Sequence, residues 1–421
     1  MRVSTIAHKY PTNRDNFFKD CGSWLNGKRE DDNAEGLWRV HDKLYDFTAF
    51  IERHPGGSEW LDITKGVDIT EQFESHHITD NAEKMLRNFY IRDAKLPRNY
   101  KLTFHPNGFY KTLKRRVASK LSGQFDRSLI ATSRFYCDLM LVSTILSFVL
   151  ASRDFNFITV LIAASCLLML SVISHNFLHQ RDNWRMYLMN LNVQSYRDWR
   201  VMHAMSHHLY PNSYHDLECV LFEPFFNWIP MDKNFLQKYV SWIISPVIYG
   251  FIFPKTGFFR YIGSIVNNYK LHWDDLIPFT MPLLMYTFGS VGIIETVIRW
   301  LTIIFVSSVI HGTISVNGGH HHNKVFHDGD ELKSLDFGVY QLAATFDRFE
   351  FQKNSFAVLT TFGQHIGHHM FPTLDHALLP QLNDIIYDTC KEFEADLVMY
   401  PWYKLFIGQF IQLTRTDINK I

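Results

Sequence analysis

The sequence predicts a small soluble α+β domain followed by an all-α integral membrane domain, with four transmembrane helices and further cytosolic or interfacial helices. Three observations support this fold class. Residues 1–130 are charged, whereas two long segments further on carry no charge at all. Residues 20–100 alternate short β-like runs with turn signals before a helical pattern begins. Histidines then gather at helical spacing close to the apolar segments.

Composition excludes several classes of protein. The 421 residues have a formal net charge of zero, so no nucleic-acid partner is implied by bulk charge. Five scattered cysteines form no CxxC pair, which argues against a disulfide scaffold or a thiolate zinc site and suits a reducing compartment. The first residues lack the apolar core of a secretory signal peptide. The 22 histidines, by contrast, need a chemical explanation.

Changes in composition divide the chain into four parts. Residues 20–100 form the predicted small domain, and residues 101–130 a linker that ends in a basic juxtamembrane segment, Lys111–Lys120. Residues 131–400 form the membrane domain, and residues 401–421 are left as a C-terminal tail.

Two apolar segments are long enough to span a membrane. Phe155–Ser174 runs for 20 residues and Leu276–Ile294 for 19 without a charge, and a hydrocarbon core of about 30 Å needs about 20 residues of helix. The apolar runs Leu139–Ser152 and Trp300–Ile310 flank them. The expected result is two hairpins, 135–152 with 155–174 and 276–294 with 300–317.

A fifth apolar stretch, Tyr239–Pro254, has 16 residues with two prolines. If it crossed the membrane, the histidines after residue 360 would lie on the opposite face from those near residue 205. If all histidine clusters meet, it must lie in the interface or re-enter. The turns on the side of the membrane away from the N-terminal domain hold only Arg153 and Arg299, whereas the side of the N-terminal domain carries Lys111–Lys120. The side that carries the N-terminal domain should therefore be cytosolic.

The small domain contains a heme-like motif. "HPGG" at His54–Gly57 follows the aromatic run "LYDFTAF", and "DITEQF" then leads to His76 and His77. A heme held by two imidazoles needs one histidine from each side, apolar walls and a close backbone approach. The candidate walls are Phe47, Phe50, Leu61, Ile69, Phe73 and Leu86.

Residues about 30–95 resemble a cytochrome b5 heme-binding domain. The resemblance implies heme b with His54 as one axial ligand. It implies His77 as the second, because the family usually places this ligand four residues beyond the phenylalanine at Phe73. His76 is the alternative, since the loop is about a residue shorter than in free cytochrome b5.

Three further histidine clusters follow the first apolar hairpin. They are "HNFLH", "HAMSHH" and "HIGHH". A pair of histidines one helical turn apart can chelate a metal. Eight imidazoles exceed what one metal takes, so two metals are expected, and imidazole suits iron, copper, zinc or nickel. The predicted ligands are His175, His179, His203, His207, His208, His365, His368 and His369.

The order of these three boxes resembles the membrane fatty acid desaturase family over residues about 130–400. With the heme-binding module, the resemblance covers nearly the whole chain. It implies a cytosolic di-iron centre, O2 and a fatty acyl or other lipid substrate at the endoplasmic reticulum membrane. No dinucleotide-binding glycine-rich motif is present, so NADH-cytochrome b5 reductase is the expected electron donor to the heme.

A fourth cluster, "SVNGGHHHN", follows the last apolar run. Some desaturases carry Asn-x3-His here, whose histidine completes the metal shell. Counted from Asn317, the Asn-x3-His motif ends at His321, which is therefore the predicted ligand, with His320 and His322 as alternatives. His311 is expected to pack between helices. The other histidines and the carboxylates that could orient imidazoles are His215, His327, His376, Asp182, Asp198, Asp216, Asp347 and Asp375.

The predicted function is a lipid desaturase that takes electrons from its own heme domain. A lipid hydroxylase, or a membrane-tethered heme electron carrier with an inactive second module, are the alternatives. Desaturases with an N-terminal cytochrome b5 domain often have glutamine where this chain has His365. This departure supports metal binding and weakens an assignment of double-bond position.

Overall fold

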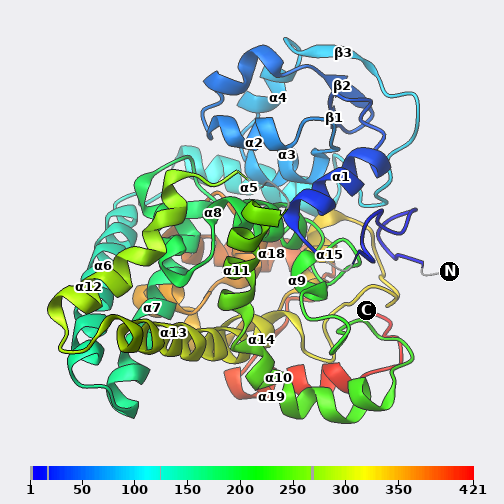
Figure 1. Cartoon of the computed structure of the whole chain (residues 1–421). Coiled ribbons are helices and arrows are strands. Elements are labelled where there is room, and N and C mark those ends of the chain that lie inside the picture. Colours follow the sequence, from blue (N-terminus) through cyan, green and yellow to red (C-terminus); the bar gives the residue numbers. More distant parts are fainter. Residues whose placement is uncertain (1–2, 17–18, 124, 267–269) are drawn as a thin grey trace.

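The computed structural model describes residues 3–16, 19–123, 125–266 and 270–421. A small α/β domain lies against one end of a larger helical domain (Figure 1). This arrangement confirms the predicted fold class. The elements up to residue 93 are α1 (Cys21–Asp31), β1 (Trp38–Val40), β2 (Lys43–Tyr45), η1 (Thr48–Arg53), α2 (Ser58–Ile63), α3 (Thr70–His76), α4 (Asn81–Leu86) and β3 (Tyr90–Asp93).

The small domain has its own core. Its three strands pair antiparallel in the order β1-β2-β3, and short helices cover the sheet. Trp38 and Val40 pack with four of the expected pocket walls, and Phe50 and Leu86 lie at the edge of this core. The four buried wall residues are Phe47, Leu61, Ile69 and Phe73.

The expected linker is a packed helix. α5 (Phe109–Ser122) buries Phe109, Tyr110, Leu113 and Val117. Its Lys111 and Lys114 make ion pairs of 3.0 and 2.7 Å with Glu74 in α3. The basic segment therefore holds the small domain in place, since two of its charges face a buried carboxylate.

The first predicted hairpin is formed by α6 (Leu129–Arg153) and α7 (Phe157–Leu178). Asn156 begins α7, because its side chain accepts hydrogen bonds from the amides of Ile158 and Thr159. Both helices are long and apolar enough to cross a membrane. α6 exposes Phe135, Leu139, Val142 and Leu146, as expected of a surface that faces lipid.

The second hairpin differs from the prediction. Leu276–Ile294 is not one helix: η5 (Trp273–Phe279) leads into α12 (Thr280–Phe288), and the chain breaks at Gly289–Gly292 before α13 (Ile293–Ile310). Two prolines, Pro278 and Pro282, and the two glycines explain the interruption, because neither residue favours a helix interior. α13 continues into the π-helical turn η6 (His311–Val316) and is a third candidate span.

The stretch around Tyr239–Pro254 forms a bent pair. η4 (Leu236–Val240) and α10 (Ser241–Tyr249) meet α11 (Ile252–Val266), with a bend of 67° between the two halves. The described residues thus hold three candidate spans, or up to four if this pair is one span. The remaining elements are η2 (Trp184–Asn192), α8 (Tyr196–Trp199), η3 (Arg200–His207), α9 (Leu217–Val220), α14 (Asn317–His320), α15 (Phe337–Ala344), β4 (Asp347–Arg348), η7 (Phe349–Phe351), α16 (Ser355–Thr360), α17 (His365–Met370), η8 (His376–Leu382), α18 (Asn383–Glu392), β5 (Met399–Tyr400) and α19 (Trp402–Thr414).

Both hairpin turns lie at the same end of the helical domain. The hydroxyl of Ser152, near the end of α6, donates to the carbonyl of Met285 in α12 at 2.6 Å, and Arg153 donates to the carbonyl of Phe288 at 2.7 Å. The small domain lies at the opposite end (Figure 1), and Asp182, shortly after α7, donates its amide to the carbonyl of Gly56 in this domain. The turns after α6 and α12 therefore lie side by side, and the return of the chain to one side after each hairpin stays a prediction. Within the predicted C-terminal tail, 401–421, the helix α19 covers Trp402–Thr414.

Candidate metal centre and heme pocket

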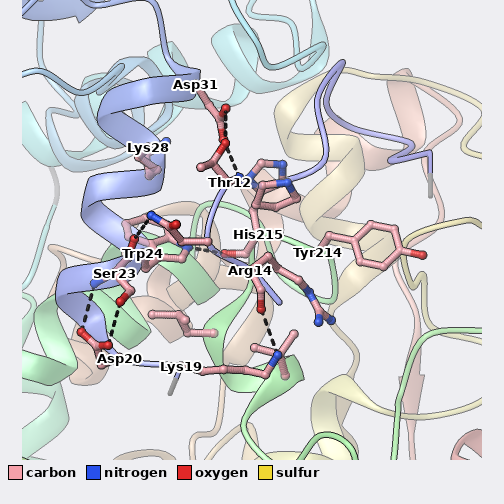
Figure 2. Close-up of a pocket in the computed structure, with 14 residues that line it drawn as sticks. Thr12, Arg14, Lys19, Asp20, Ser23, Trp24, Lys28, Asp31, Tyr214 and His215 are labelled. Carbon is pink, nitrogen blue, oxygen red and sulfur yellow. Dashed lines mark hydrogen bonds between the residues drawn. The ribbon is translucent and has the colours of Figure 1, made fainter. Parts of the chain in front are cut away.

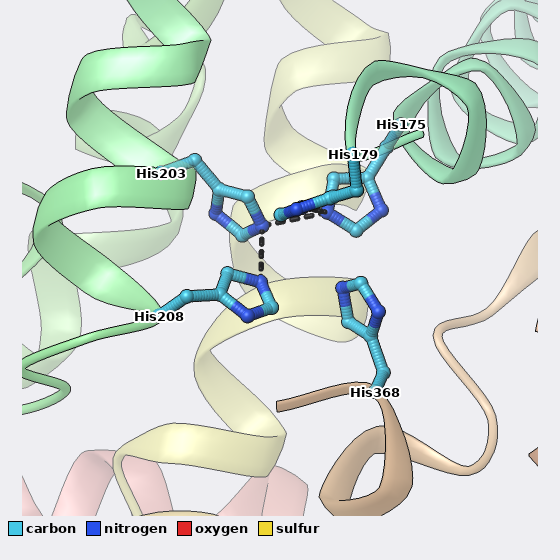
Figure 3. A group of neighbouring side chains, drawn as sticks. All are labelled: His175, His179, His203, His208 and His368. Carbon is cyan, nitrogen blue, oxygen red and sulfur yellow. Dashed lines mark hydrogen bonds between the residues drawn. The ribbon is translucent and has the colours of Figure 1, made fainter. Parts of the chain in front are cut away.

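Five histidines from three separate segments meet at the end of α7. Their ligating nitrogens all lie within 4.8 Å of one another, and all five side chains are buried. Figure 3 shows the rings turned toward one central point. This first group comprises His175, His179, His203, His208 and His368.

A second group lies directly beside the first. It comprises His207, His320 and His369, again with ligating nitrogens within 4.8 Å. Nε2 of His365 lies 3.1 Å from Nε2 of His320 and extends this group. The rings of His208 and His369 stack at 4.1 Å and connect the two groups. All eight predicted box histidines therefore contribute to one buried site.

The second box is a π-helical turn. The amide of His208 donates to the carbonyl five residues back, at His203, over 2.8 Å. This longer turn places His203 and His208 in the first group and sends His207 to the second. π turns occur frequently at functional sites, and simple α-helical counting does not reveal this division.

His321 is not part of either group. Its ring stacks on Trp228 at 3.9 Å, and its Nδ1 hydrogen-bonds with His327 at 3.0 Å. Its neighbour His320 faces the ligands in its place, so the assignment of His321 is corrected to His320. The side chain of Asn317, which set the predicted register, lies outside the described part of the structure.

Outer partners orient the imidazoles. Nδ1 of His203 faces Glu218 at 2.6 Å, and Nδ1 of His207 faces Asp216 at 2.9 Å. Nδ1 of His369 lies 3.1 Å from the side-chain oxygen of Gln341. Each contact fixes one ring nitrogen and leaves Nε2 for the interior, which is how histidine ligands are usually held.

Two of these partners were missed from the sequence. Glu218 was not among the predicted carboxylates, although Asp216-Leu217-Glu218 closely follows the second box, and no amide partner such as Gln341 was predicted. His376 bonds to Nδ1 of His368 at 2.9 Å, as an outer partner. Asp347 instead accepts from the backbone amide of His365. The other predicted carboxylates, Asp182, Asp198 and Asp375, bind arginine or polar groups.

The electrostatics of the site favour a bound cation. Burial lowers the pKa of His208 and His369 well below its usual range, so both are neutral and able to ligate. At His207 burial acts in the same direction, but the carboxylates of Glu218 and Asp216 outweigh it and raise the pKa to about 9. Burial also raises the pKa of Glu218 to about 7, so the two carboxylates favour a positive charge at His207, which a proton or a metal ion can supply.

The nitrogens at the centre also fit a metal. Nε2 of His175 lies 2.6 Å from Nε2 of His203 and 2.9 Å from Nε2 of His179. Such close nitrogen contacts need a proton or a cation between the lone pairs. Nε2 of His368 and of His369 are buried and have no hydrogen-bond partner among the described residues. An all-imidazole set suits iron, copper, zinc or nickel.

The heme-like motif forms a second candidate site. The rings of His54 and His77 face each other with centroids 6.3 Å apart. Nδ1 of His54 bonds to the carbonyl of Gly57 at 2.9 Å, and Nδ1 of His77 to that of Phe73 at 3.0 Å. Neither Nε2 atom hydrogen-bonds within the described part of the chain, and the ring separation leaves room for one iron with two metal–nitrogen bonds of about 2 Å. His76 turns elsewhere, which favours His77 as the second ligand.

His215 is a member of neither histidine group. It lines a small pocket between the N-terminal segment, α1 and the loop that follows the second box (Figure 2). The pocket's volume of about 20 Å³ suits about one water molecule rather than a lipid. Arg14 in its wall is paired with Glu223.

The two candidate sites are joined by direct contacts. The amide of Asp182, just beyond the first box, donates to the carbonyl of Gly56 at 3.3 Å. Arg200, at the start of the second box, pairs with both Asp182 and Glu59. The heme-like loop therefore rests on the segments that supply the metal ligands.

Comparison with known proteins agrees with this architecture. Residues 25–95 match the family "Cytochrome b5-like Heme/Steroid binding domain", and residues 155–401 match "Fatty acid desaturase". The "Cytochrome b5-related protein" of Drosophila melanogaster is 43% identical, over 99% of this chain and 97% of the relative. The "Probable Delta(5) fatty acid desaturase C" of Dictyostelium discoideum is 25% identical, over 93% and 94%.

A third relative is the "Acyl-lipid (8-3)-desaturase" of Mortierella alpina, 23% identical over 89% of this chain and 92% of the relative. No solved structure matches significantly. The desaturase match alone spans more than half of the chain, and a relative that is similar from end to end shares both modules. The chain therefore belongs to the fatty acid desaturase family and carries an N-terminal cytochrome b5-like domain.

Proposed function

We propose that this protein is a membrane-bound lipid desaturase that introduces a double bond into a fatty acyl chain with O2. The observation that carries the proposal is the meeting of all eight box histidines with His320 in two adjoining buried groups. Relatives named as acyl-lipid and Delta(5) fatty acid desaturases are similar over about nine tenths of the chain. Two iron ions are the metals that this function requires.

Each part of the chain has a role in this reaction. Removing two hydrogens from an unactivated alkyl chain needs a strong oxidant, which two irons with O2 supply when bound. The imidazole Nε2 atoms would hold the irons, and Glu218 and Asp216 would fix ring orientation and balance charge. Burial of the ligands keeps bulk water away.

Electrons would come from heme b held by His54 and His77 in the same chain. The heme would be reduced again by NADH-cytochrome b5 reductase. Direct contacts between the two sites support their placement on one side of the membrane, and we assign this side to the cytosol and the membrane to the endoplasmic reticulum. A donor module fixed beside its acceptor has a high effective concentration.

The test is lipid analysis of yeast expressing the whole chain, with His368→Ala as the matched inactive variant. We expect new acyl species that lack two hydrogens in the wild type and not in the variant. A product that gains one oxygen would identify a hydroxylase instead. Unchanged lipids, together with no iron beyond that of the heme, would identify an electron carrier.

A further inference from the structure

His76 lies beside the heme ligand His77 but faces the other way. Its Nδ1 bonds to the carbonyl of Gln72 at 2.9 Å. Its Nε2 is buried and has no hydrogen-bond partner among the residues that the structure describes. A buried polar atom without a partner costs free energy, so an imidazole at this place calls for a reason other than packing.

The side of α3 that carries His76 faces the metal ligands. The hydroxyl of Thr373, shortly after the third box, donates to the carbonyl of His76 at 3.1 Å. The hydroxyl of Tyr110 bonds to the carbonyl of Met370, the last residue of the third-box helix, at 2.9 Å and contacts that of Glu74 at 3.4 Å. The first-box segment is also near, since the amide of Asp182, three residues after His179, donates to the carbonyl of Gly56 at 3.3 Å.

An aromatic contact extends from His76 toward the second box. Its ring lies 5.6 Å from the ring of Trp60. The guanidinium of Arg200 lies over Trp60 at 4.6 Å. Next to Arg200 in the chain, the ring of Trp199 lies 4.8 Å from that of the ligand His203. Packed groups therefore connect the heme-binding loop to the metal ligands.

We propose that His76, supported by Trp60, is the relay through which electrons pass from the heme to the metal centre. This inference rests on the proposed function. Each transfer carries one electron from a ferrous heme, which becomes ferric, to the metal centre. One O2 is reduced to two waters by four electrons and four protons. The heme supplies two of the electrons, the acyl chain supplies two electrons and two protons, and solvent supplies the other two protons. Tunnelling is faster through packed atoms than across a gap, so removing the ring should slow the transfer.

The experiment uses the full-length protein with heme and ferric iron in nanodiscs, without O2 or lipid substrate. A light-generated deazaflavin radical reduces the heme, and the decay of ferrous heme absorbance then reports transfer to the metal centre. We expect His76→Leu to slow this decay by at least about tenfold, the effect of a barrier raised by about 1.4 kcal/mol. The heme spectrum and its midpoint potential should stay as in the wild type. His76→Gln keeps a hydrogen-bond donor for the carbonyl of Gln72, and its ferrous heme should decay equally slowly. This variant replaces His76→Leu in the test if His76→Leu folds poorly.

The control variant is His215→Leu, which removes another histidine whose Nε2 is buried and has no partner among the described residues, but which lies off this route. Its decay should match the wild type. A wild-type decay rate in His76→Leu would overturn the relay, and so would loss of the bis-histidine heme spectrum. Equal slowing in His215→Leu would point to loosened packing and also overturn it. If the wild type itself showed no decay, the electron supply in the proposed function would fail as well.

Discussion

His320 and His321 are adjacent, yet only His320 points at the ligand groups. His320 lies 3.1 Å from both His207 and His365 through its Nε2. His321 is held away by its stack on Trp228. One residue of register therefore decides whether the second group has a complete set of imidazoles.

We predict that His320→Ala removes about one metal ion per chain. Losing an outer partner of a ligand already costs about 10–100-fold in metal affinity, and losing a ligand should cost more. The measurement is elemental analysis of purified protein, with heme iron subtracted. His321→Phe keeps the ring on Trp228 and should retain both metals. Loss of a metal ion from His321→Phe and not from His320→Ala would instead identify His321 as the ligand, as the sequence predicted.

His215 makes the stability of the folded chain depend on pH. Burial first, and then the charge of Lys28, lower its pKa to about 3, whereas an unfolded histidine has a pKa of about 6.5. The folded state therefore excludes a proton that the unfolded state takes up. The stability contributed by neutral His215 is complete above about pH 6.5 and falls below it by up to about 1.4 kcal/mol per pH unit.

We predict that His215→Leu weakens this pH dependence. The midpoint of thermal unfolding should fall less between about pH 7 and about pH 5 in the variant than in the wild type, measured in detergent. Parallel curves for the two proteins would show that His215 is protonated equally in the folded and unfolded states.

The predicted histidines that the structure brings together share a simple physical basis. Box histidines repeat at helical spacing, and the heme motif needs HPGG with aromatic neighbours, so local patterns were sufficient. His320 could not be selected because the π turn η6 precedes it, and a π turn takes more residues than an α turn. Glu218 and Gln341 depend on tertiary folding, since Gln341 reaches His369 from another helix, α15.

At the scale of elements, the loop that holds His54 must fit two neighbours at once. Gly57 has a positive φ of 119°, and a Cβ at this position would lie 2.6 Å from the carboxylate of Asp182. Glycine is thus required by conformation and also by the close approach of the first-box segment. The same residue shapes the heme pocket and joins the two domains.

We predict that Gly57→Ala loosens α3 and the heme loop from the metal domain. Gly36 provides a matched control, because its φ is 78° but a Cβ there would meet nothing within 4 Å. In both variants the free energy of unfolding should fall by about 1–3 kcal/mol because of backbone strain. Only Gly57→Ala should also speed amide hydrogen exchange across Thr70–His76. Equal exchange in both variants would mean that the contact with Asp182 does not hold the loop.

The membrane elements show the limit of hydropathy as a guide. α6 and α7 were predicted well because long uncharged runs can only be buried or placed in lipid. The break between α12 and α13 depends on proline and glycine positions, which a count of apolar residues does not register. The bent pair at Tyr239–Pro254 likewise follows tertiary contacts, since α10 and α11 both pack on α13.

At the scale of the whole molecule, the heme domain is docked rather than loosely tethered. Arg197 and Arg200 of the helical domain pair with Glu59 of the small domain, and Tyr210, just beyond the second box, donates to Glu71 at 3.2 Å. Ion pairs from α5 reach Glu74 as well. A buried interface of this kind leaves little room for an exchange of donors between chains.

This docking predicts that oxidation of the heme by the metal centre occurs within one chain. Its first-order rate should stay constant when the concentration of the iron-loaded protein is changed over about two orders of magnitude, because the donor is already at its acceptor. Reduction of the heme by a light-generated deazaflavin radical without O2, followed by the decay of ferrous heme absorbance, measures this rate. The control mixes two variants. His368→Ala keeps its heme and can only donate electrons, whereas His54→Ala keeps the histidine groups of the metal centre and can only accept them. The pair should not exchange electrons, because the docking face of each metal domain is covered by its own heme domain. A rate that rises with concentration, or restored oxidation in the mixed pair, would show that the heme domain leaves its site to serve other chains.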